Sequence, residues 1–145
     1  MSKIIYNLGY VFTESLNKVY LLDIDKPGKL GHGLVNGIGG KVDIMSNETP
    51  VHSMIREFRE EAGQTINHWE QVGIYTGDDY IIHVFYATVK EAYLPEYKGP
   101  EGICKWYDAN ALPKMLSSNV NISIGMIIRR LTYKNKLFFN LENTL

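Results

Sequence analysis

Three glutamates near the middle of the chain have the spacing to act together on one ligand. Glu57, Glu60 and Glu61 stand at positions i, i+3 and i+4, so they lie on one side of a helix. Like charges at this spacing destabilise an isolated helix by about 0.2–0.5 kcal/mol per pair, which suggests that a cation reverses the sign. Hard oxygen ligands favour magnesium, or manganese, with phosphate and water completing the shell. A solvated acidic helix face is the alternative interpretation.

The segment that carries these glutamates has the signals of a helix from Pro50 to Ala62. Thr49 can cap the free amide groups, Pro50 suits the first position because no N–H is needed there, and Gly63 suits the left-handed residue that ends a helix. Apolar residues recur at the spacing of one helical face, at Val51, Met54, Ile55, Phe58 and Ala62. This face is predicted to pack inward, beside the carboxylates.

Two glycines, Gly39 and Gly40, precede this helix and can bring the backbone close to a ligand. With Glu48 and the run 56–63, Arg-Glu-Phe-Arg-Glu-Glu-Ala-Gly, they resemble the Nudix box, the signature of hydrolases that cleave nucleoside diphosphates linked to another group. Seven residues stand between Gly40 and Glu48, where the pattern has five, and Gln64 replaces the closing apolar residue. A motif with this many fixed positions seldom arises by chance.

The resemblance implies a metal site and a reaction. Magnesium, or manganese, would be held by Glu57 and Glu61, with Glu60 and the Gly39 carbonyl contributing, and would lower the pKa of a bound water that attacks phosphorus. A carboxylate of this cluster, or Glu101 in the later acidic loop, would accept the proton of that water. For Glu101, a simple surface carboxylate is the alternative interpretation.

The same resemblance implies supporting and substrate-binding residues. Glu48 and Arg56 would form an ion pair that holds the loop on the helix, and Lys41 would contact phosphate. The run 34–41 is similar to the Trp-Asn-Gly-x-Gly-Gly-Lys run of Nudix enzymes that act on nucleoside triphosphates, which makes Asn36 a candidate for contact with the base. A turn asparagine bonded to its own backbone is the alternative. Asn119 can also offer an amide to a nucleobase.

Three functions remain open at this point. The favoured one is hydrolysis of a (deoxy)nucleoside triphosphate to a monophosphate and pyrophosphate. The second is hydrolysis of ADP-ribose or a dinucleotide, because the box determines the bond that is cleaved and not the group beyond it. The third is a non-catalytic nucleotide sensor, against which the intact glutamates argue.

The remaining segments predict an α/β protein with a sheet on which the box helix packs, and the resemblance implies the Nudix α/β/α sandwich with a mixed sheet. Strands are predicted at 4–13, 18–24, 69–76, 80–89 and 103–108. Residues 25–40 are expected to be a loop with sharp turns, 109–116 a short helix, and 120–133 an amphipathic helix.

Composition limits the partners. The chain has 145 residues, 45% hydrophobic and 21% charged, as expected of a single domain over 1–145. A formal net charge of −1 provides no field for a nucleic acid, so a small-molecule nucleotide is the expected partner, and monomer and homodimer both remain open. The single cysteine and the lack of a signal peptide or membrane-length apolar run favour the cytoplasm.

Overall fold

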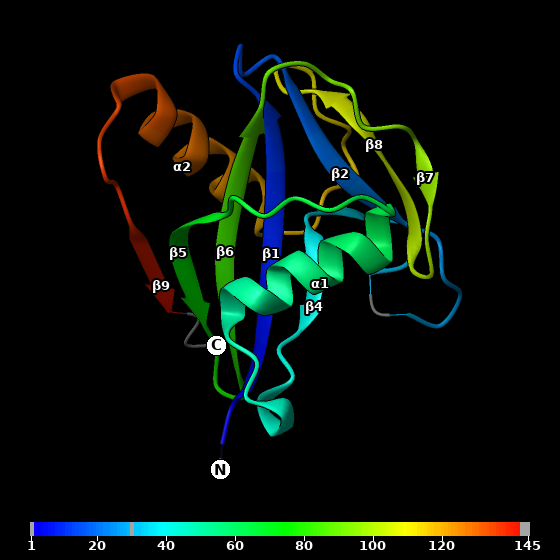
Figure 1. Cartoon of the computed structure of the whole chain (residues 1–145), viewed down its shortest axis with the longest axis vertical. Helices are drawn as coiled ribbons and strands as arrows, with labels where there is room; N and C mark the ends of the chain where they lie inside the picture. The colour runs from blue at the N-terminus through cyan, green and yellow to red at the C-terminus, as the bar shows by residue number, and fades with distance from the viewer. Residues whose placement is uncertain (1, 30, 143–145) are drawn as a thin grey trace.

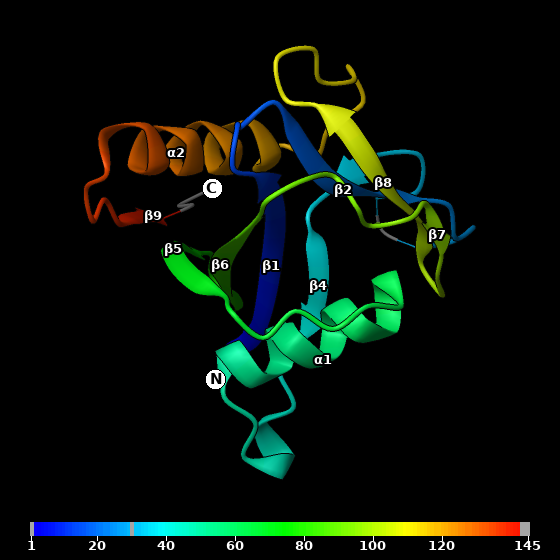
Figure 2. The same cartoon turned by 45° about the horizontal axis from the view of Figure 1, so that its top comes forward.

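A mixed β-sheet with one helix on each face forms the centre of the protein, whose computed structural model describes residues 2–29 and 31–142 (Figures 1 and 2). The strands are β1 (Ile4–Thr13), β2 (Lys18–Ile24), β3 (Val35–Asn36), β4 (Ile38–Lys41), β5 (Glu70–Thr76), β6 (Tyr80–Val89), β7 (Tyr97–Lys98), β8 (Gly102–Asp108) and β9 (Phe139–Glu142). The helices are α1 (Pro50–Ala62) and α2 (Val120–Tyr133), with a single 3-10 turn, η1 (Ile44–Ser46), before α1.

The sheet runs in the order β7-β8-β2-β1-β6-β5-β9, with β3 paired to β2 and β4 paired to β1. The pairs β1–β6 and β5–β9 are parallel and the other pairs are antiparallel. The predicted α/β class with a mixed sheet is therefore confirmed.

Side chains that alternate along β1 build a separate core on each face of the sheet. Val11 packs in the core that contains Met54 and Phe58 of α1, whereas Tyr10 and Phe12 pack in the core that contains the apolar face of α2. Successive side chains of a strand point to opposite faces, which explains this division. Figure 2 shows the two helices on opposite sides of the sheet, so the sandwich arrangement is confirmed.

The signals predicted for α1 are all present in the structure. The Thr49 side chain accepts a hydrogen bond from the backbone N–H of His52, Pro50 is the first helical residue, and Gly63 ends the helix with a φ of 71°. Met54 and Phe58 are fully buried, as expected for the inward face.

The sheet forks between β1 and β2. β1 pairs with β2 at Val11 and Phe12, but its earlier part, Tyr6 to Gly9, pairs with β4 instead. β2 continues away from this point and pairs with β3 at Leu22 and Asp23. The segment from β3 to β4 therefore crosses the fork, and it brings the glycines of the box to the opening.

Two predictions about irregular segments were wrong. The expected loop 25–40 contains β3 and the first residues of β4, because its backbone groups pair with β2 and β1. The expected helix 109–116 consists of turns, and the backbone carbonyl of Met115 and the backbone N–H of Ser117 bond to Val35. The short strands β7 and β9 were not predicted.

No helix within residues 2–29 and 31–142 is long and apolar enough to cross a membrane.

Candidate active site

Gly40 allows the carboxylate of Glu57 to lie against the backbone of β4. A Cβ atom at Gly40 would overlap the Glu57 carboxylate, and one at Gly39 would overlap the backbone of Asn7 on β1. Neither glycine has a positive φ. The two glycines are therefore needed for close approach and not for a sharp turn, and they bring the Gly39–Gly40 backbone next to the first predicted metal ligand on α1.

Asn7 holds this backbone in place and was not predicted from the sequence. Its side chain is buried, donates to the Ser53 hydroxyl of α1 at 2.5 Å, and accepts from the backbone N–H of Gly40 at 3.2 Å. Buried polar groups are rarely left unpaired, so this amide fixes the distance between β1, β4 and α1. The available signal was a polar residue within an apolar strand.

Arg56 is the centre of an ion-pair network on the outer side of α1. Its guanidinium binds Glu48 through two bonds, Nε to Oε2 at 2.7 Å and Nη2 to Oε1 at 2.9 Å, which is the strong bidentate geometry. These bonds from Arg56 lower the pKa of Glu48 to about 2. Glu48 also accepts from the backbone N–H of Asp43 at 2.9 Å. The structure thus contains the expected Glu48–Arg56 pair, and this pair ties the loop around η1 to the helix.

Arg56 also binds two of the three box glutamates. Its Nη1 lies 3.0 Å from Oε1 of Glu57 and 3.2 Å from Oε2 of Glu60. Glu60 is 49% exposed and does not line the cavity described below, whereas Glu57 does. The three glutamates therefore do not gather at one point, because Glu60 faces solvent while Glu57 faces inward.

Glu61 is buried close to two other carboxylates. It is 5% exposed, and its Oε2 atom has no hydrogen-bond partner. Burial, followed by the negative charges of Glu101 and Glu57, raises the pKa of Glu61 to about 7. Burial likewise raises the pKa of Glu57, although Arg56 opposes the shift. Glu57, Glu61 and Glu101 thus form the acidic group of the site.

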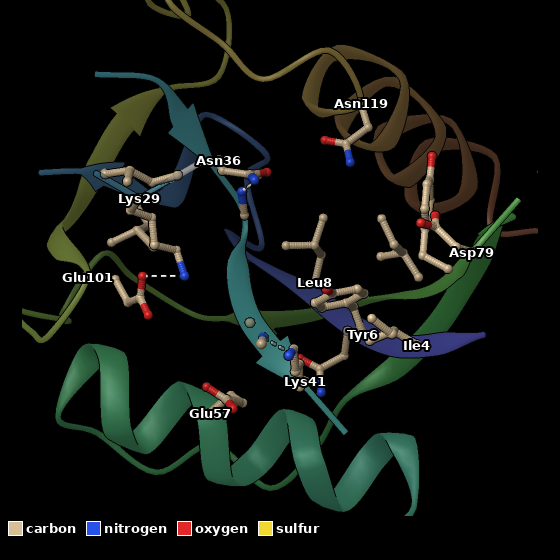
Figure 3. A pocket seen from close by; sticks show the side chains of 18 residues that line it. Ile4, Tyr6, Leu8, Lys29, Asn36, Lys41, Glu57, Asp79, Glu101 and Asn119 are labelled. Atoms are coloured by element: carbon tan, nitrogen blue, oxygen red, sulfur yellow. Dashed lines mark hydrogen bonds and ion pairs between the residues drawn. The ribbon is translucent and has the colours of Figure 1, made fainter. Parts of the chain in front are cut away.

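Lys29, from the loop between β2 and β3, pairs with Glu101 at the start of β8. Lys29 Nζ lies 2.5 Å from Glu101 Oε2 (Figure 3). The sequence did not single out Lys29, because it is far from the box along the chain and lies in a glycine-rich loop. Lys29 also lines the cavity described below, so it gives the site a cation.

The donor set fits a hard divalent cation. Among residues 2–29 and 31–142, no group of three His, Cys, Asp or Glu side chains is arranged to hold a metal ion by itself. Instead, Arg56 pairs with Glu57, and Lys29 pairs with Glu101. However, Mg²⁺ is commonly bound by one or two carboxylates together with substrate phosphates and water. Glu57 and the unpaired oxygen of Glu61 can supply those carboxylates.

Glu57, Glu101 and Lys29 form one end of an open cavity of about 770 Å³ in the fork of the sheet, and Glu61 is buried beside these carboxylates outside the cavity lining. Figure 3 shows Glu57 on one side of the cavity, and Asn36 and Asn119 on the opposite side. Apolar and aromatic side chains lie between them, mainly from β1 and β6: Ile4, Tyr6, Leu8, Leu22, Ile24, Tyr80 and Ile82. The charged residues of the lining include Lys29, Lys41, Glu101 and Asp79, the last of which was not predicted.

Asn36 is bonded to the backbone like a turn asparagine and also lies where it could contact a ligand. Its Oδ1 accepts a hydrogen bond from the backbone N–H of Gly37 at 2.8 Å, as in a turn, and the residue also lines the cavity. The bond from Gly37 uses one lone pair of this oxygen, so the NH₂ group and the second lone pair stay available to a ligand. Asn119 lines the cavity too, and its buried Oδ1 has no partner.

Similar structures are known for proteins whose sequences differ widely from this one. A NUDIX hydrolase from Nitrosomonas europaea is 16% identical with a TM-score of 0.74, covering 99% of this chain and 81% of that one. The NUDIX domain of Shewanella oneidensis NrtR complexed with ADP ribose is 16% identical with a TM-score of 0.75, covering 90% of each chain. A Mutator MutT protein from Bacillus halodurans is 20% identical with a TM-score of 0.69, covering 97% and 90%.

At these identities the structural similarity concerns the fold, and a sequence comparison with curated proteins finds no match. The family follows from the sequence itself, because the family model described as the NUDIX domain matches residues 10–126, a range that contains the whole box and most of the cavity. The chain belongs to the NUDIX family and is a Nudix hydrolase, an enzyme that hydrolyses a pyrophosphate bond.

Proposed function

We propose that this enzyme hydrolyses (deoxy)nucleoside triphosphates to a monophosphate and pyrophosphate. The observation that supports this substrate class is the presence of two amide side chains, Asn36 and Asn119, across the cavity from the acidic group. An amide offers both donor and acceptor atoms, which suits the edge of a nucleobase. The base would lie near these amides, and the phosphates would lie near Glu57 and Glu101.

We infer that Mg²⁺, or Mn²⁺, binds with the substrate at this acidic end. Glu57 and Glu61 would hold it together with the Gly39 carbonyl, and Glu60 would join them only after release from Arg56. When bound, the metal neutralises phosphate oxygens and lowers the pKa of water.

The protein's own groups would then position the phosphates and accept a proton. Lys41 and Lys29 line the cavity and can bind phosphate oxygens, although Lys29 must first leave Glu101. Once released, the Glu101 carboxylate is free to accept the proton of the attacking water. A carboxylate of the acidic group is the second candidate, and Glu61 has a carboxylate oxygen without a hydrogen-bond partner.

ADP-ribose is a second candidate substrate. The cavity of about 770 Å³ is open and falls within the range of cavities that enclose small ligands, so it also has room for a second sugar. The NUDIX domain of NrtR, which has a similar fold, was crystallised with ADP ribose. Dinucleotides belong to the same class.

One screen distinguishes these possibilities. The purified protein would be incubated with Mg²⁺ and, separately, with canonical and oxidised nucleoside triphosphates, ADP-ribose and dinucleotides, and the products separated by chromatography. The proposal expects monophosphate and pyrophosphate from triphosphates. Faster cleavage of ADP-ribose would support the second candidate. Binding of nucleotides without any metal-dependent cleavage would point instead to a nucleotide sensor.

A further inference from the structure

Asn119 stands directly before α2, at the N-cap position, but its side chain does not cap the helix. Asparagine at this position usually accepts a hydrogen bond from an N–H of the first turn and has an extended backbone. Here the side chain makes no capping bond, and the backbone is right-handed helical, with φ −89° and ψ −8°. The Oδ1 atom is buried without a partner at the cavity wall. The amide is therefore free for a ligand.

Two hydroxyl groups hold the backbone of Asn119 in this arrangement. Tyr75 of β5 donates from its hydroxyl to the Asn119 carbonyl at 3.1 Å, and the same hydroxyl lies 3.0 Å from the Ser123 hydroxyl in the first turn of α2. Ser123 is fully buried and also donates its backbone N–H to the Asn119 carbonyl at 3.0 Å. The protons balance if Ser123 donates to Tyr75 and Tyr75 donates to Asn119.

Tyr10 lies close both to this pair and to the segment of the other amide. Its hydroxyl is buried beside Ser123, and burial raises its pKa, so it stays neutral. Its ring lies directly against Gly37, the residue that fixes the Asn36 side chain. The Tyr10 side chain thus packs against Gly37 near one amide and lies near Ser123 close to the other.

We propose that Tyr75 and Ser123 are positioning residues that keep the Asn119 amide pointed into the base end of the cavity. This inference rests on the proposed function, because it assigns Asn119 to the base. Without the Tyr75 bond, the first turn of α2 can relax and the Asn119 side chain can rotate to cap the helix, which removes its amide from the cavity.

The test is a double-mutant cycle on Tyr75 and Asn119. Tyr75→Phe keeps the ring and removes only the hydroxyl, and it should lower kcat/KM for a purine triphosphate about 3- to 10-fold, which is the value of one hydrogen bond. Asn119→Ala should lower it at least as much. In the Asn119→Ala background, Tyr75→Phe should have no further effect, because its action passes through Asn119.

A substrate without a base separates positioning from general damage. Ribose 5-triphosphate should be hydrolysed by wild type, Tyr75→Phe and Asn119→Ala at rates within about 2-fold of one another. Tyr86→Phe is the matched control, since it also removes a tyrosine hydroxyl that is bonded to a side chain, that of Glu70, outside the cavity. Ser123→Ala provides a second variant that should reproduce the Tyr75→Phe result.

Two results would overturn the inference: equal losses of kcat/KM on the triphosphate with and without a base, or a Tyr75→Phe effect that persists in the Asn119→Ala background. A wrong substrate assignment gives a different result, because the wild-type protein would then cleave ADP-ribose and not triphosphates. In that case the same cycle, run on ADP-ribose, decides whether Tyr75 acts through Asn119.

Discussion

Two carboxylates of the acidic group, Glu57 and Glu61, lie one turn apart on the same helix but differ in their charge partners. Glu57 has Arg56 as a partner 3.0 Å away, so its charge is balanced in the free protein. Glu61 has no such partner, and burial together with Glu101 and Glu57 raises its pKa to about 7. A divalent cation would favour the charged form of both groups, so binding of metal should be coupled to loss of a proton from Glu61.

The first prediction tests both residues as ligands. Glu57→Gln and Glu61→Gln each remove a charge and preserve the shape, so turnover at saturating Mg²⁺ should fall by about 10²-fold or more. Glu70→Gln is the control, because that exposed glutamate also pairs with an arginine but lies outside the cavity. Circular dichroism should report an unchanged fold. If either the Glu57 or the Glu61 variant turned over substrate at nearly the wild-type rate, the metal site would lie elsewhere.

The second prediction concerns stability against pH in metal-free protein. The pKa of Glu61 is raised from 4.5 to about 7 in the folded state. Its contribution to stability is therefore complete below about pH 4.5 and is lost as the pH rises through about 7. The loss is at most about 3 kcal/mol, at 1.36 kcal/mol per pKa unit.

Urea unfolding at pH 5 and pH 8 measures this effect. The wild type should lose stability between these values relative to Glu61→Gln, which cannot titrate at this position. Saturating Mg²⁺ should restore stability to the wild type at pH 8, since a ligand that binds only the folded state stabilises it. Parallel pH profiles for the two proteins would show that Glu61 is not the titrating group.

At the same scale, local spacing indicated the residues of the box but not their neighbours in space. Glu57, Glu61, Glu48 and Arg56 lie within one short stretch, so their positions followed from the motif and from the period of the helix. Lys29 and Asn7 reach the site from other segments, and only tertiary pairing brings them there. Asp79 comes from the β5–β6 turn for the same reason.

At the scale of elements, α1 was predictable because its signals are local. Thr49, Pro50 and Gly63 lie at the helix ends, and their capping roles need no distant partner. β3 and β4 were missed since a glycine-rich segment has low strand propensity, and their pairing depends on β2 and β1. Residues 109–116 failed as a helix because their end pairs with Val35 instead.

The Glu48–Arg56 ion pair holds the loop between β4 and α1 on the helix, which gives the third prediction. Arg56 is 30% exposed and Glu48 14%, so the pair lies between the surface and buried cases. Arg56→Ala should lower the free energy of unfolding by about 1–3 kcal/mol, because Glu48 loses a bidentate partner. The lowered pKa of Glu48 also sets the pH dependence of this stability. The contribution of Glu48 is complete above about pH 4.5 and is lost as the pH falls through about 2.

Arg59→Ala is the matched control, since Arg59 lies in the same helix and is exposed. Chemical unfolding at pH 7 and turnover should be measured on both variants, and only Arg56→Ala should lose stability. An unchanged melting temperature with weakened turnover would mean that Arg56 acts on the substrate and not on the loop.

At the scale of the whole molecule, the cavity exists only because the sheet forks. Its walls come from β1, β2, β3, β4, β6, α1 and the residue before α2, so no single segment of the sequence could predict it. The alternation of apolar residues did predict the strands and hence the layers, but not how far β1 and β2 separate. The proposed selection of a base would therefore be a property of the assembled fold.

The fourth prediction concerns that specificity. Enzymes that distinguish one base strongly do so by leaving buried polar atoms unpaired when the wrong base binds, at a cost of about 1–3 kcal/mol for each group. Asn36 and Asn119 each offer an amide donor and an amide acceptor, although Gly37 already uses one lone pair of the Asn36 oxygen. No acidic side chain occurs between Pro113 and Asn119 to bond an altered base edge. The amides should accept more than one base or tautomer.

We therefore expect kcat/KM for 8-oxo-dGTP and dGTP to differ by less than about 100-fold, since a single adaptable amide contributes about 1–3 kcal/mol of discrimination. Asn36→Ala should weaken purine triphosphates by about 1–3 kcal/mol because it removes the donor. Asn110→Ala, an exposed asparagine outside the cavity, is the control. Steady-state kinetics on both nucleotides decide the matter: a preference well above 100-fold for the oxidised nucleotide, or no effect of Asn36→Ala on any nucleotide, would rule out this base site.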